Sequence, residues 1–307
     1  MDMHIDFAGI PLKNPVLTAS GTFGFGLEFM RYGDLSTLGG IVVKGLSLRP
    51  REGNPMPRIA ETPGGMLNAI GIQNPGVEEF LKRKLPYIPK DATIIANLYA
   101  CDAAEFGELA GVLAAEERIA GLEVNVSCPN VKEGGAAFGQ DPAQITKVTK
   151  AVKTRAGSKP VIVKLSPNVT DIVACARAAV AGGADGLSLI NTLSGMAVDA
   201  RTRLPRLANI VGGLSGPAIK PVALRCVHQV CAAVDVPVMG LGGISSAEDA
   251  AEFLLVGAHA VQVGTANFLR PDFSFRLVAE LEAFLAQIGV SSLEEYRGSL
   301  RTAVFAS

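Results

Sequence analysis

Eight short apolar runs recur along the chain, and most are separated by segments with helical character. The runs are rich in Val, Ile and Leu and are bounded by Gly, Pro or polar residues. Apolarity that is continuous rather than alternating is what strands buried on both faces of a parallel sheet require. The predicted strands are residues 16–19, 41–43, 93–96, 122–126, 161–165, 186–190, 236–241 and 260–263.

The segments between these runs predict helices, one of which follows the N-cap candidate Asp141. Eight strands with intervening helices predict an α/β fold, a (β/α)8 TIM barrel, rather than an open doubly wound sheet. The length of 307 residues fits such a barrel in one piece, and no repeat or linker divides it, so we expect a single domain over residues 1–307. The predicted helices are residues 103–120, 142–154, 169–181, 219–233 and 247–256.

Two further segments have expected places in this barrel. Residues 4–11 are typical of a hairpin, which we expect to plug the bottom of the barrel. Residues 46–89 are rich in Gly and Pro and are expected to form an elaborated loop after the second strand.

Composition and charge exclude several functional classes. The formal net charge is -1 and the pI is near 6.3, which gives no electrostatic footprint for nucleic acid or an anionic membrane. The first residues include Asp2, His4 and Asp6 and are not a signal peptide, and the longest apolar stretches, such as residues 250–263, are interrupted. We therefore expect a cytoplasmic protein that binds neither nucleic acid nor membrane.

The cysteines argue against disulfides and metals. They are five in number and widely spaced, unlike a secreted disulfide framework. Cys226 and Cys231 flank His228, but no CxxC pair or second His cluster completes a metal site. No group of four cysteines is available for an iron–sulfur centre in this chain.

Polar residues follow the predicted strands at their carboxyl ends. In a barrel all of these ends meet at one face, where barrel enzymes place their chemistry. Two lysines, three amides and one thiol at that face are costly to bury without a polar ligand. The strand ends carry Ser20, Gly21, Lys44, Gly45, Asn97, Asn125, Cys128, Lys164, Asn191, Thr192, Gly242, Gly243, Gly264 and Thr265.

Two glycine-containing segments, residues 241–250 and 257–266, indicate a phosphate site. Glycines let backbone N–H groups approach an anion, and a short helix after the eighth strand adds a favourable dipole. Residues 212–217 could contribute a third loop from the same side. The pattern does not distinguish a phosphorylated cofactor from a phosphorylated substrate.

The remaining candidates favour a planar, anionic ligand. A lysine that ends an apolar strand, as Lys44 and Lys164 do, is an expensive choice unless it pairs with an anion. Residues 68–74 supply amides and backbone donors that could bind a polar ring with a carboxylate. Cys128 has two possible roles. It could be a small buried side chain, as unpaired cysteines often are. It could instead be a reactive thiol, because Pro129 prevents a regular helical continuation directly after it and so places it where a strand opens into a loop.

Taken together, these segments resemble dihydroorotate dehydrogenase over nearly the whole chain. The resemblance implies an FMN-binding barrel that oxidises dihydroorotate to orotate in de novo pyrimidine biosynthesis. It is carried by residues 18–26, 43–45, 53–58, 68–71, 125–130, 164–167 and 191–192, together with the Gly-Gly phosphate segments.

The resemblance also implies a subclass and partners. Cys128 matches class 1, whereas the membrane-associated class 2 enzymes have serine there, and residues 21–26 and 68–73 look like class 1B rather than 1A. A class 1B catalytic subunit pairs with a subunit that carries FAD and a [2Fe–2S] cluster and passes electrons to NAD. We therefore expect a homodimer associated with that partner, a heterotetramer.

Roles follow from the resemblance position by position. Cys128 is the expected base for the C5 proton of dihydroorotate, while hydride moves from C6 to flavin N5, and Lys164 would lie near flavin N1 and O2. The residues expected to hold the substrate are Lys44, Asn68, Ala69, Ile70, Gly71, Ile72, Asn125, Asn191 and Thr192. Those expected to bind FMN are Ser20, Lys44, Gly45, Asn97, Asn125, Lys164 and Ile190, with Gly216, Gly242, Gly243, Gly264 and Thr265 at the phosphate.

Two alternatives remain open at this point. One is a related FMN barrel that uses fumarate as acceptor or acts on another pyrimidine. The other is a phosphate-binding barrel without redox chemistry, such as an isomerase or a regulatory binder.

Overall fold

The computed structural model describes residues 1–126 and 139–301. Within them, eight parallel strands form a closed barrel in chain order, the last pairing with the first. This confirms the predicted TIM barrel. The barrel strands are β3 (Val16–Thr18), β4 (Gly40–Val42), β7 (Ile94–Leu98), β8 (Ile119–Asn125), β9 (Val161–Leu165), β10 (Gly186–Leu189), β15 (Val238–Leu241) and β16 (Ala260–Val263).

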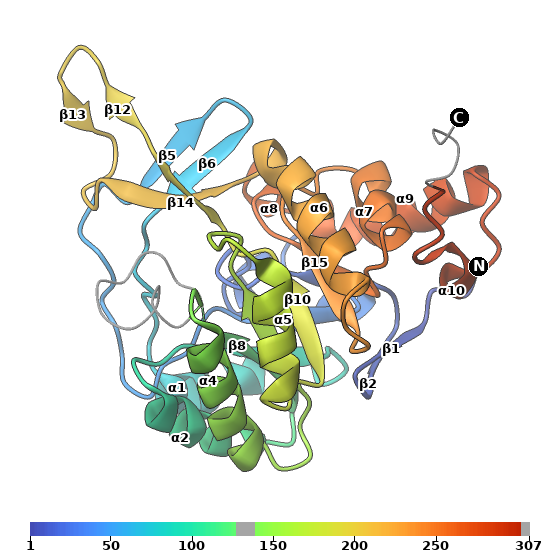
Figure 1. Cartoon of the computed structure of the whole chain (residues 1–307), viewed down its shortest axis with the longest axis horizontal. Helices are drawn as coiled ribbons and strands as arrows, with labels where there is room; N and C mark the ends of the chain where they lie inside the picture. The colour runs from blue at the N-terminus through green and yellow to red at the C-terminus, as the bar shows by residue number, and fades with distance from the viewer. Residues whose placement is uncertain (127–138, 302–307) are drawn as a thin grey trace.

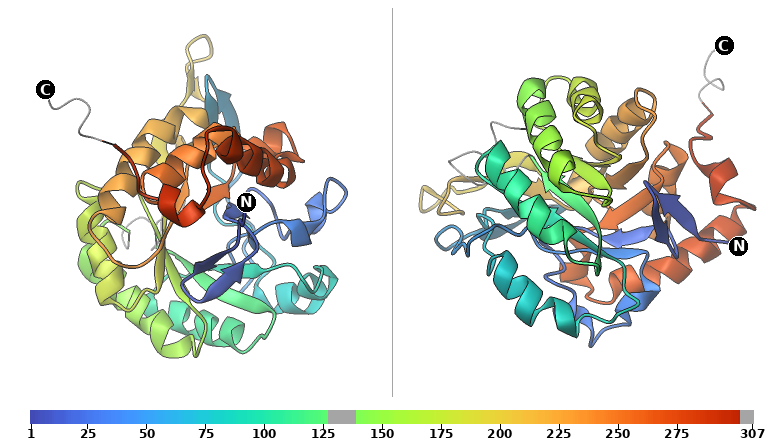
Figure 2. Two further views of the ribbon diagram at one scale, coloured as in Figure 1. Left: turned by 90° about the vertical axis from the view of Figure 1, so that its right-hand side faces the viewer. Right: turned by 90° about the horizontal axis from the view of Figure 1, so that it is seen from below.

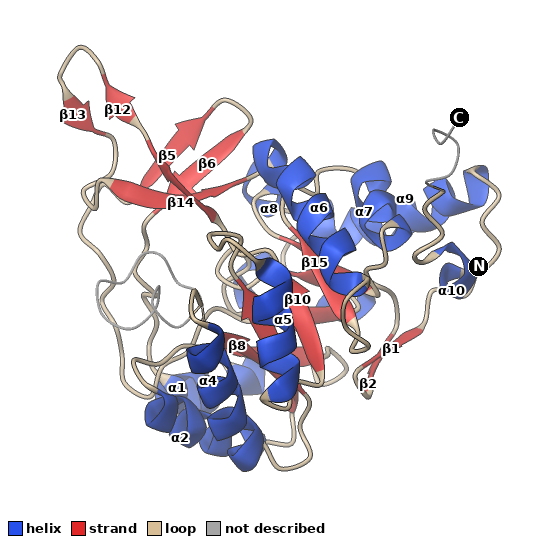
Figure 3. Cartoon of the chain, in the orientation of Figure 1, coloured by secondary structure: helices blue, strands red, loops and turns tan. Residues whose placement is uncertain are grey.

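Helices surround the barrel (Figure 3). Asp102, Asp141, Asp171 and Ser246 each accept a backbone N–H bond at a helix start, which marks where four of the helices begin. The helices are α1 (Val77–Arg83), α2 (Ala103–Ala114), α4 (Pro142–Arg155), α5 (Ile172–Ala181), α6 (Lys220–Cys231), α7 (Ala247–Leu255), α8 (Ala266–Leu269), α9 (Phe273–Gln287) and α10 (Leu293–Tyr296).

Two predicted helix limits were wrong. The helix expected over residues 103–120 ends at Ala114, because the chain enters strand β8 at Ile119. The helix expected to begin at residue 169 begins at Ile172, where the Asp171 side chain accepts from two backbone amides. The long helix α9 was not predicted.

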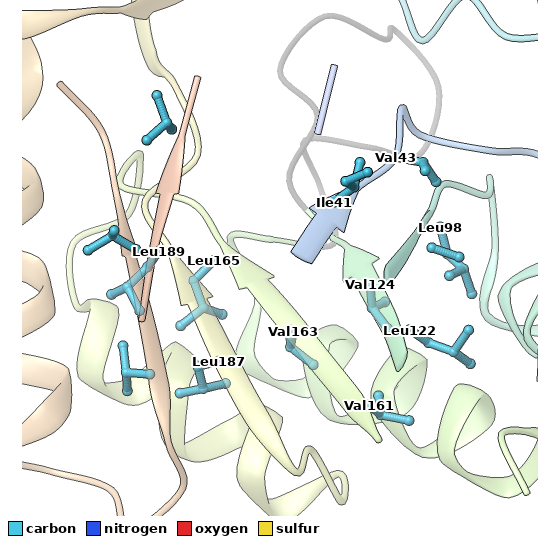
Figure 4. Packing of buried hydrophobic residues seen from close by; sticks show 14 of the residues in the cluster. Ile41, Val43, Leu98, Leu122, Val124, Val161, Val163, Leu165, Leu187 and Leu189 are labelled. Atoms are coloured by element: carbon cyan, nitrogen blue, oxygen red, sulfur yellow. The ribbon is translucent and has the colours of Figure 1, made fainter. Parts of the chain in front are cut away.

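The outer surface of the barrel packs against the helices. Val161, Val163 and Leu165 alternate along β9 with residues that point inward, and Leu187 and Leu189 do the same on β10 (Figure 4). All five are buried in one apolar cluster that also contains helix residues. The strand sequences therefore have to be apolar on the outside, while the inward positions are available for other side chains.

The barrel interior is divided into an apolar base and a polar upper level. At the base, Phe7, Ile10 and Leu12 of the hairpin β1 (Ile5–Phe7) and β2 (Ile10–Leu12) pack against inward-pointing barrel residues. Figure 2 shows this hairpin across one end of the barrel, which confirms the predicted plug. A Cβ on Gly121 would lie 2.7 Å from Ile10 Cδ1, so the fit is close. The barrel side chains of the base are Leu17, Val42, Ile95, Ile162, Met239 and Ala260.

A small antiparallel sheet extends from the opposite end of the barrel (Figure 1). Its strands lie in the order β11 (Leu193–Met196), β14 (Val211–Ser215), β6 (Gly65–Asn68) and β5 (Ile59–Thr62). A hairpin of β12 (Val198–Asp199) and β13 (Leu204–Pro205) continues from it. The expected loop 46–89 therefore contains two strands and helix α1. Nowhere in the described ranges is there a helix with the length and apolar character needed to cross a membrane.

Most of the proposed third phosphate loop, residues 212–217, is strand rather than loop. Residues 211–215 pair with β6 and β11. A Cβ on Gly212 would lie 2.6 Å from the Asn68 carbonyl oxygen, so glycine is needed there for the approach of two strands. Ser215, Gly216 and Pro217 nevertheless reach the cavity described next.

Candidate active site at the barrel mouth

A cavity of about 400 Å³ lies at the carboxyl ends of the barrel strands, the face called the mouth below. Cavities at this face are where barrel enzymes bind their ligands. The structure brings together all but two of the predicted site residues here. Its lining includes Ser20, Lys44, Gly45, Asn68, Ile70, Gly71, Ile72, Asn97, Asn125, Lys164, Ile190, Asn191, Thr192, Gly216, Gly242, Gly243, Gly264 and Thr265.

The two exceptions are Ala69 and Cys128. Ala69 does not line the cavity: its side chain is buried against Leu67 and Leu207, and its carbonyl oxygen accepts from Asn54 Nδ2. The side chain of Ala69 therefore does not contact a ligand in the cavity. Cys128 lies outside the described residues.

A polar network, absent from the sequence prediction, occupies the upper level of the barrel interior. Glu123 on β8 is fully buried and accepts hydrogen bonds from Asn97 Nδ2, Ser188 Oγ and Gln262 Nε2 at 2.7, 2.8 and 2.7 Å. Lys164 Nζ lies 3.6 Å from Glu123 Oε1. Asn97, Lys164 and Gln262 line the cavity and are called its floor. The sequence contained one sign of this network: Glu123 and Gln262 each lie inside an apolar run.

Lys44 projects into the cavity from the end of β4. Its pKa is held below the usual value of 10.5, first by burial and then by the charge of Arg58, against an opposing contribution from Glu28. A half-buried ammonium in this state gains from an anionic partner, because the partner restores the electrostatic stabilisation that water no longer gives. Lys44 is therefore placed to bind an anionic ligand.

One wall of the cavity is a backbone segment in an uncommon conformation. Ile72 has φ 58°, which is rare for a β-branched residue. Its carbonyl oxygen accepts from Asn74 Nδ2 at 2.8 Å, and the neighbouring Ile70 carbonyl accepts from Asn54 N at 2.9 Å. Strained conformations of this kind persist where surrounding contacts hold them, and they cluster at ligand sites.

Two asparagines meet on the other side of the cavity. Asn191 Nδ2 donates to Asn125 Oδ1 at 3.2 Å, and Asn191 Oδ1 accepts from the Thr192 backbone N–H at 2.8 Å. The Thr192 carbonyl accepts from Asn168 Nδ2 at 2.9 Å, so Asn168, which sequence reasoning missed, holds this segment in place.

The far end of the cavity is built from backbone. Gly216, Gly242 and Gly243 have φ values of 99°, 123° and 85° and are called the glycine end. A Cβ on Gly243 would lie 2.8 Å from Lys220 N, and one on Gly216 would lie 2.6 Å from Gly65 Cα. Only glycine fits such positions, because an added Cβ would collide with neighbouring protein backbone.

The loops of the glycine end are joined by an ion-pair network. Lys220 Nζ lies 2.5 Å from Asp249 Oδ1 and 2.7 Å from Glu252 Oε2. Burial acts to lower the pKa of Lys220, but its hydrogen bonds to the two carboxylates outweigh burial and raise it. Asp249 Oδ2 accepts from both N and Oγ of Ser245, at 2.8 Å each. Because two carboxylates match the charge of Lys220, we expect uncharged groups rather than this ammonium to bind a ligand at the glycine end.

Two features match a planar ring that carries a phosphate arm. In the floor, Asn97 Oδ1 and Gln262 Oε1 are buried and have no hydrogen-bond partner among the described residues, so they suit a ligand with N–H groups. At the other end, the cradle of glycines suits an anion bound by backbone. In the part of the chain that the structure describes, no three His, Cys, Asp or Glu side chains are arranged to hold a metal ion.

A closed parallel barrel with a ligand-sized cavity at its mouth, lined in part by lysine and amide side chains, is the architecture of the (β/α)8-barrel enzymes. The sequence profile of the dihydroorotate dehydrogenase family matches residues 3–285. This chain therefore belongs to the dihydroorotate dehydrogenase family, as its sequence predicts.

Individual proteins agree with this assignment. The chain is 74% identical over 302 residues to the dihydroorotate dehydrogenase B (NAD(+)) catalytic subunit of Maridesulfovibrio salexigens, covering 98% of this chain and 99% of that protein. The subunit of the same name from Solidesulfovibrio magneticus is 70% identical over the same shares. The fold matches the crystal structure of Eimeria tenella DHODH in complex with ferulenol, with a TM-score of 0.80 at 22% identity over 97% of this chain and 88% of that one.

Proposed function

We propose that the chain oxidises dihydroorotate to orotate with FMN bound at the barrel mouth, as the catalytic subunit of an NAD-linked enzyme. The observation that carries this proposal is the convergence of Lys44, Lys164 and the amide side chains on one cavity that ends in a glycine cradle. The names of the close relatives, which are NAD(+)-dependent catalytic subunits, support the same reaction.

The two ends of the cavity suit the two parts of FMN, its ring and its phosphate. The floor residues Asn97, Lys164 and Gln262 would contact the ring, and the ring would also meet Ser20, Gly45 and Ile190. Backbone N–H groups at the glycine end, with Gly264 and Thr265, would hold the phosphate. When bound, FMN supplies the hydride acceptor that the oxidation requires.

The substrate would be held by charge on one side and by amides on the other. Lys44 would pair with the carboxylate of dihydroorotate, since its half-buried ammonium gains from an anion. Asn68, Asn125 and Asn191 would bind the polar edges of the ring, and residues 70–72 and Thr192 would complete the wall around it.

Cys128 is the proposed base for the C5 proton. It follows Asn125, which lines the cavity, by three positions in the sequence. A thiol has an ordinary pKa near 8.5 and is a weak base at neutral pH, so hydrogen-bond donors around the substrate carbonyl would have to stabilise the developing charge.

The partners are proposed from the relatives. Their name, catalytic subunit, implies a second subunit. We propose that this subunit carries FAD and a [2Fe–2S] cluster and passes electrons to NAD, that two catalytic chains form a homodimer within a heterotetramer, and that the complex works in the cytoplasm.

The proposal is tested with the purified chain alone and with its co-expressed partner. We expect a yellow protein that contains FMN, releases FMN on denaturation and is bleached by dihydroorotate. We expect orotate formation with NAD to need the partner. The Cys128→Ala variant should keep FMN and lose most turnover. A colourless protein after incubation with FMN would overturn the assignment, and turnover of Cys128→Ala near the wild-type rate would remove Cys128 as the base.

A further inference from the structure

A buried carboxylate lies behind the floor of the cavity without lining it. Both oxygens of Glu123 are engaged: Oε1 by Asn97 Nδ2, with Lys164 Nζ at 3.6 Å, and Oε2 by Ser188 Oγ and Gln262 Nε2. The partners come from β7, β9, β10 and β16, so one side chain connects four other barrel strands.

These contacts decide which end of each amide points toward the carboxylate and which end points away from it. A carboxylate has hydrogen-bond acceptors only, so an amide that contacts it turns its NH₂ group toward it and its oxygen away. The oxygens turned away are Asn97 Oδ1 and Gln262 Oε1, which are two of the six buried side-chain atoms that lack a hydrogen-bond partner among the described residues. The polarity of the floor is thus a consequence of the charge at Glu123.

We propose that Glu123 is a positioning residue, which orients Asn97 and Gln262 and anchors Lys164 so that the floor offers two amide oxygens and one ammonium to the bound ring. The proposal rests on the proposed function, in which that ring is the isoalloxazine of FMN. The uracil-like edge of this ring has one N–H donor between two carbonyl acceptors, so it needs both an acceptor and a cationic donor from the protein. A floor that presented amide NH₂ groups would meet the donor N–H with another donor.

The Glu123→Gln variant tests this polarity at constant shape. The new amide places one NH₂ group where Glu123 has an acceptor, so the NH₂ of Asn97 or of Gln262 loses its acceptor and turns toward the cavity. We expect FMN to bind at least about tenfold more weakly to the apoprotein, measured by quenching of FMN fluorescence. We also expect the visible absorption spectrum of bound FMN to shift, because it reports hydrogen bonds to the ring.

Ser188→Ala is the matched control. It removes one hydrogen bond from the same carboxylate but leaves its charge and both amide contacts in place, so FMN affinity should stay within about twofold of wild type. Equal weakening by Ser188→Ala and Glu123→Gln would indicate a purely structural role and would overturn the proposal. Wild-type affinity and spectrum in Glu123→Gln would overturn it too. Failure of the wild-type apoprotein to bind FMN would instead overturn the proposed function.

A second variant keeps the test decisive if Glu123→Gln does not fold, as judged by thermal unfolding of the apoprotein. Combining Glu123→Gln with Gln262→Glu moves the carboxylate to β16 and keeps one amide and one acid in the network. The new amide on β8 can then donate to the new carboxylate on β16 and accept from Asn97, so Asn97 Oδ1 and a carboxylate oxygen still face the cavity. We expect this double variant to bind FMN within about fivefold of wild type. A folded double variant without FMN binding would contradict the proposal.

Discussion

The two ends of the cavity present polar groups by different means. The floor does so with side chains on strand ends, whose charge and orientation depend on a buried network around Glu123. The glycine end does so with backbone, and the cation nearest to it, Lys220, is paired with Asp249 and Glu252. One end therefore depends on charge and polarity, and the other on the close approach of backbone segments that only glycine allows.

This difference predicts different failures on substitution. A change in the floor alters electrostatics and leaves a buried charge without its partner, which is among the costliest defects in a protein interior. A change at the glycine end introduces atoms where there is no room, and its cost is steric. Each expected effect below tests one side of this contrast.

The largest expected effect comes from removing a lysine. Lys164→Met should lower the free energy of unfolding of the apoprotein by about 3 kcal/mol, because it leaves the fully buried Glu123 without a cation. Lys220→Met is the matched variant: its side chain is 25% exposed, and Asp249 keeps its bonds from Ser245, so the expected loss is about 1 kcal/mol. Urea unfolding of the two variants measures the difference, and equal losses would remove the contrast between the ends.

The second effect is steric. Gly243→Ala forces an alanine to φ 85° and places its Cβ 2.8 Å from Lys220 N. Gly289 has a similar φ of 79° but nothing within 4 Å of an added Cβ. We expect Gly289→Ala to cost about 1 kcal/mol and Gly243→Ala about 2 to 3 kcal/mol, together with weaker FMN binding. If thermal melts show the same loss for both, the glycine end has room for a side chain and its steric role is refuted.

The third effect depends on pH and concerns Lys44. Its lowered pKa means that the folded chain releases this proton below pH 10.5, earlier than the unfolded chain. The destabilisation caused by the buried charge therefore diminishes as pH rises through that pKa. Under the proposed function, orotate would lose its counterion over the same range, and its affinity would fall. Lys44→Met should bind orotate about tenfold more weakly at neutral pH, without this alkaline decline. Calorimetric titration with orotate from pH 7 to 10 measures the affinity at neutral pH and its decline at higher pH. An identical decline in Lys44→Met would exclude Lys44 as the origin of the decline.

The sequence predicted the barrel and most of the cavity for one physical reason. Strands buried on both faces are mostly apolar, so a polar residue at or near the end of such a run, such as Lys44 or Asn97, stands out. Once the barrel is inferred, its topology brings all such ends to one mouth. That is why 18 different predicted residues line the same cavity.

The parts that were not predicted depend on pairings across long stretches of sequence. Glu123 and Gln262 are 139 positions apart, and each is a single polar residue within a strand, so nothing local indicates that they touch. Asn68 and Gly213, which join the two halves of the projecting sheet, are 145 positions apart. Both contacts exist only because the closed barrel brings distant segments together.

The hairpin at the base has a consequence for the order of events in turnover. Phe7, Ile10 and Leu12 fill the lower barrel, so the barrel axis is no channel from one end of the molecule to the other. Under the proposed function, orotate then has to depart on the same side from which dihydroorotate arrived, and it must do so before another substrate molecule is admitted. Arrival and departure become mutually exclusive, so orotate is expected to inhibit by direct competition with dihydroorotate.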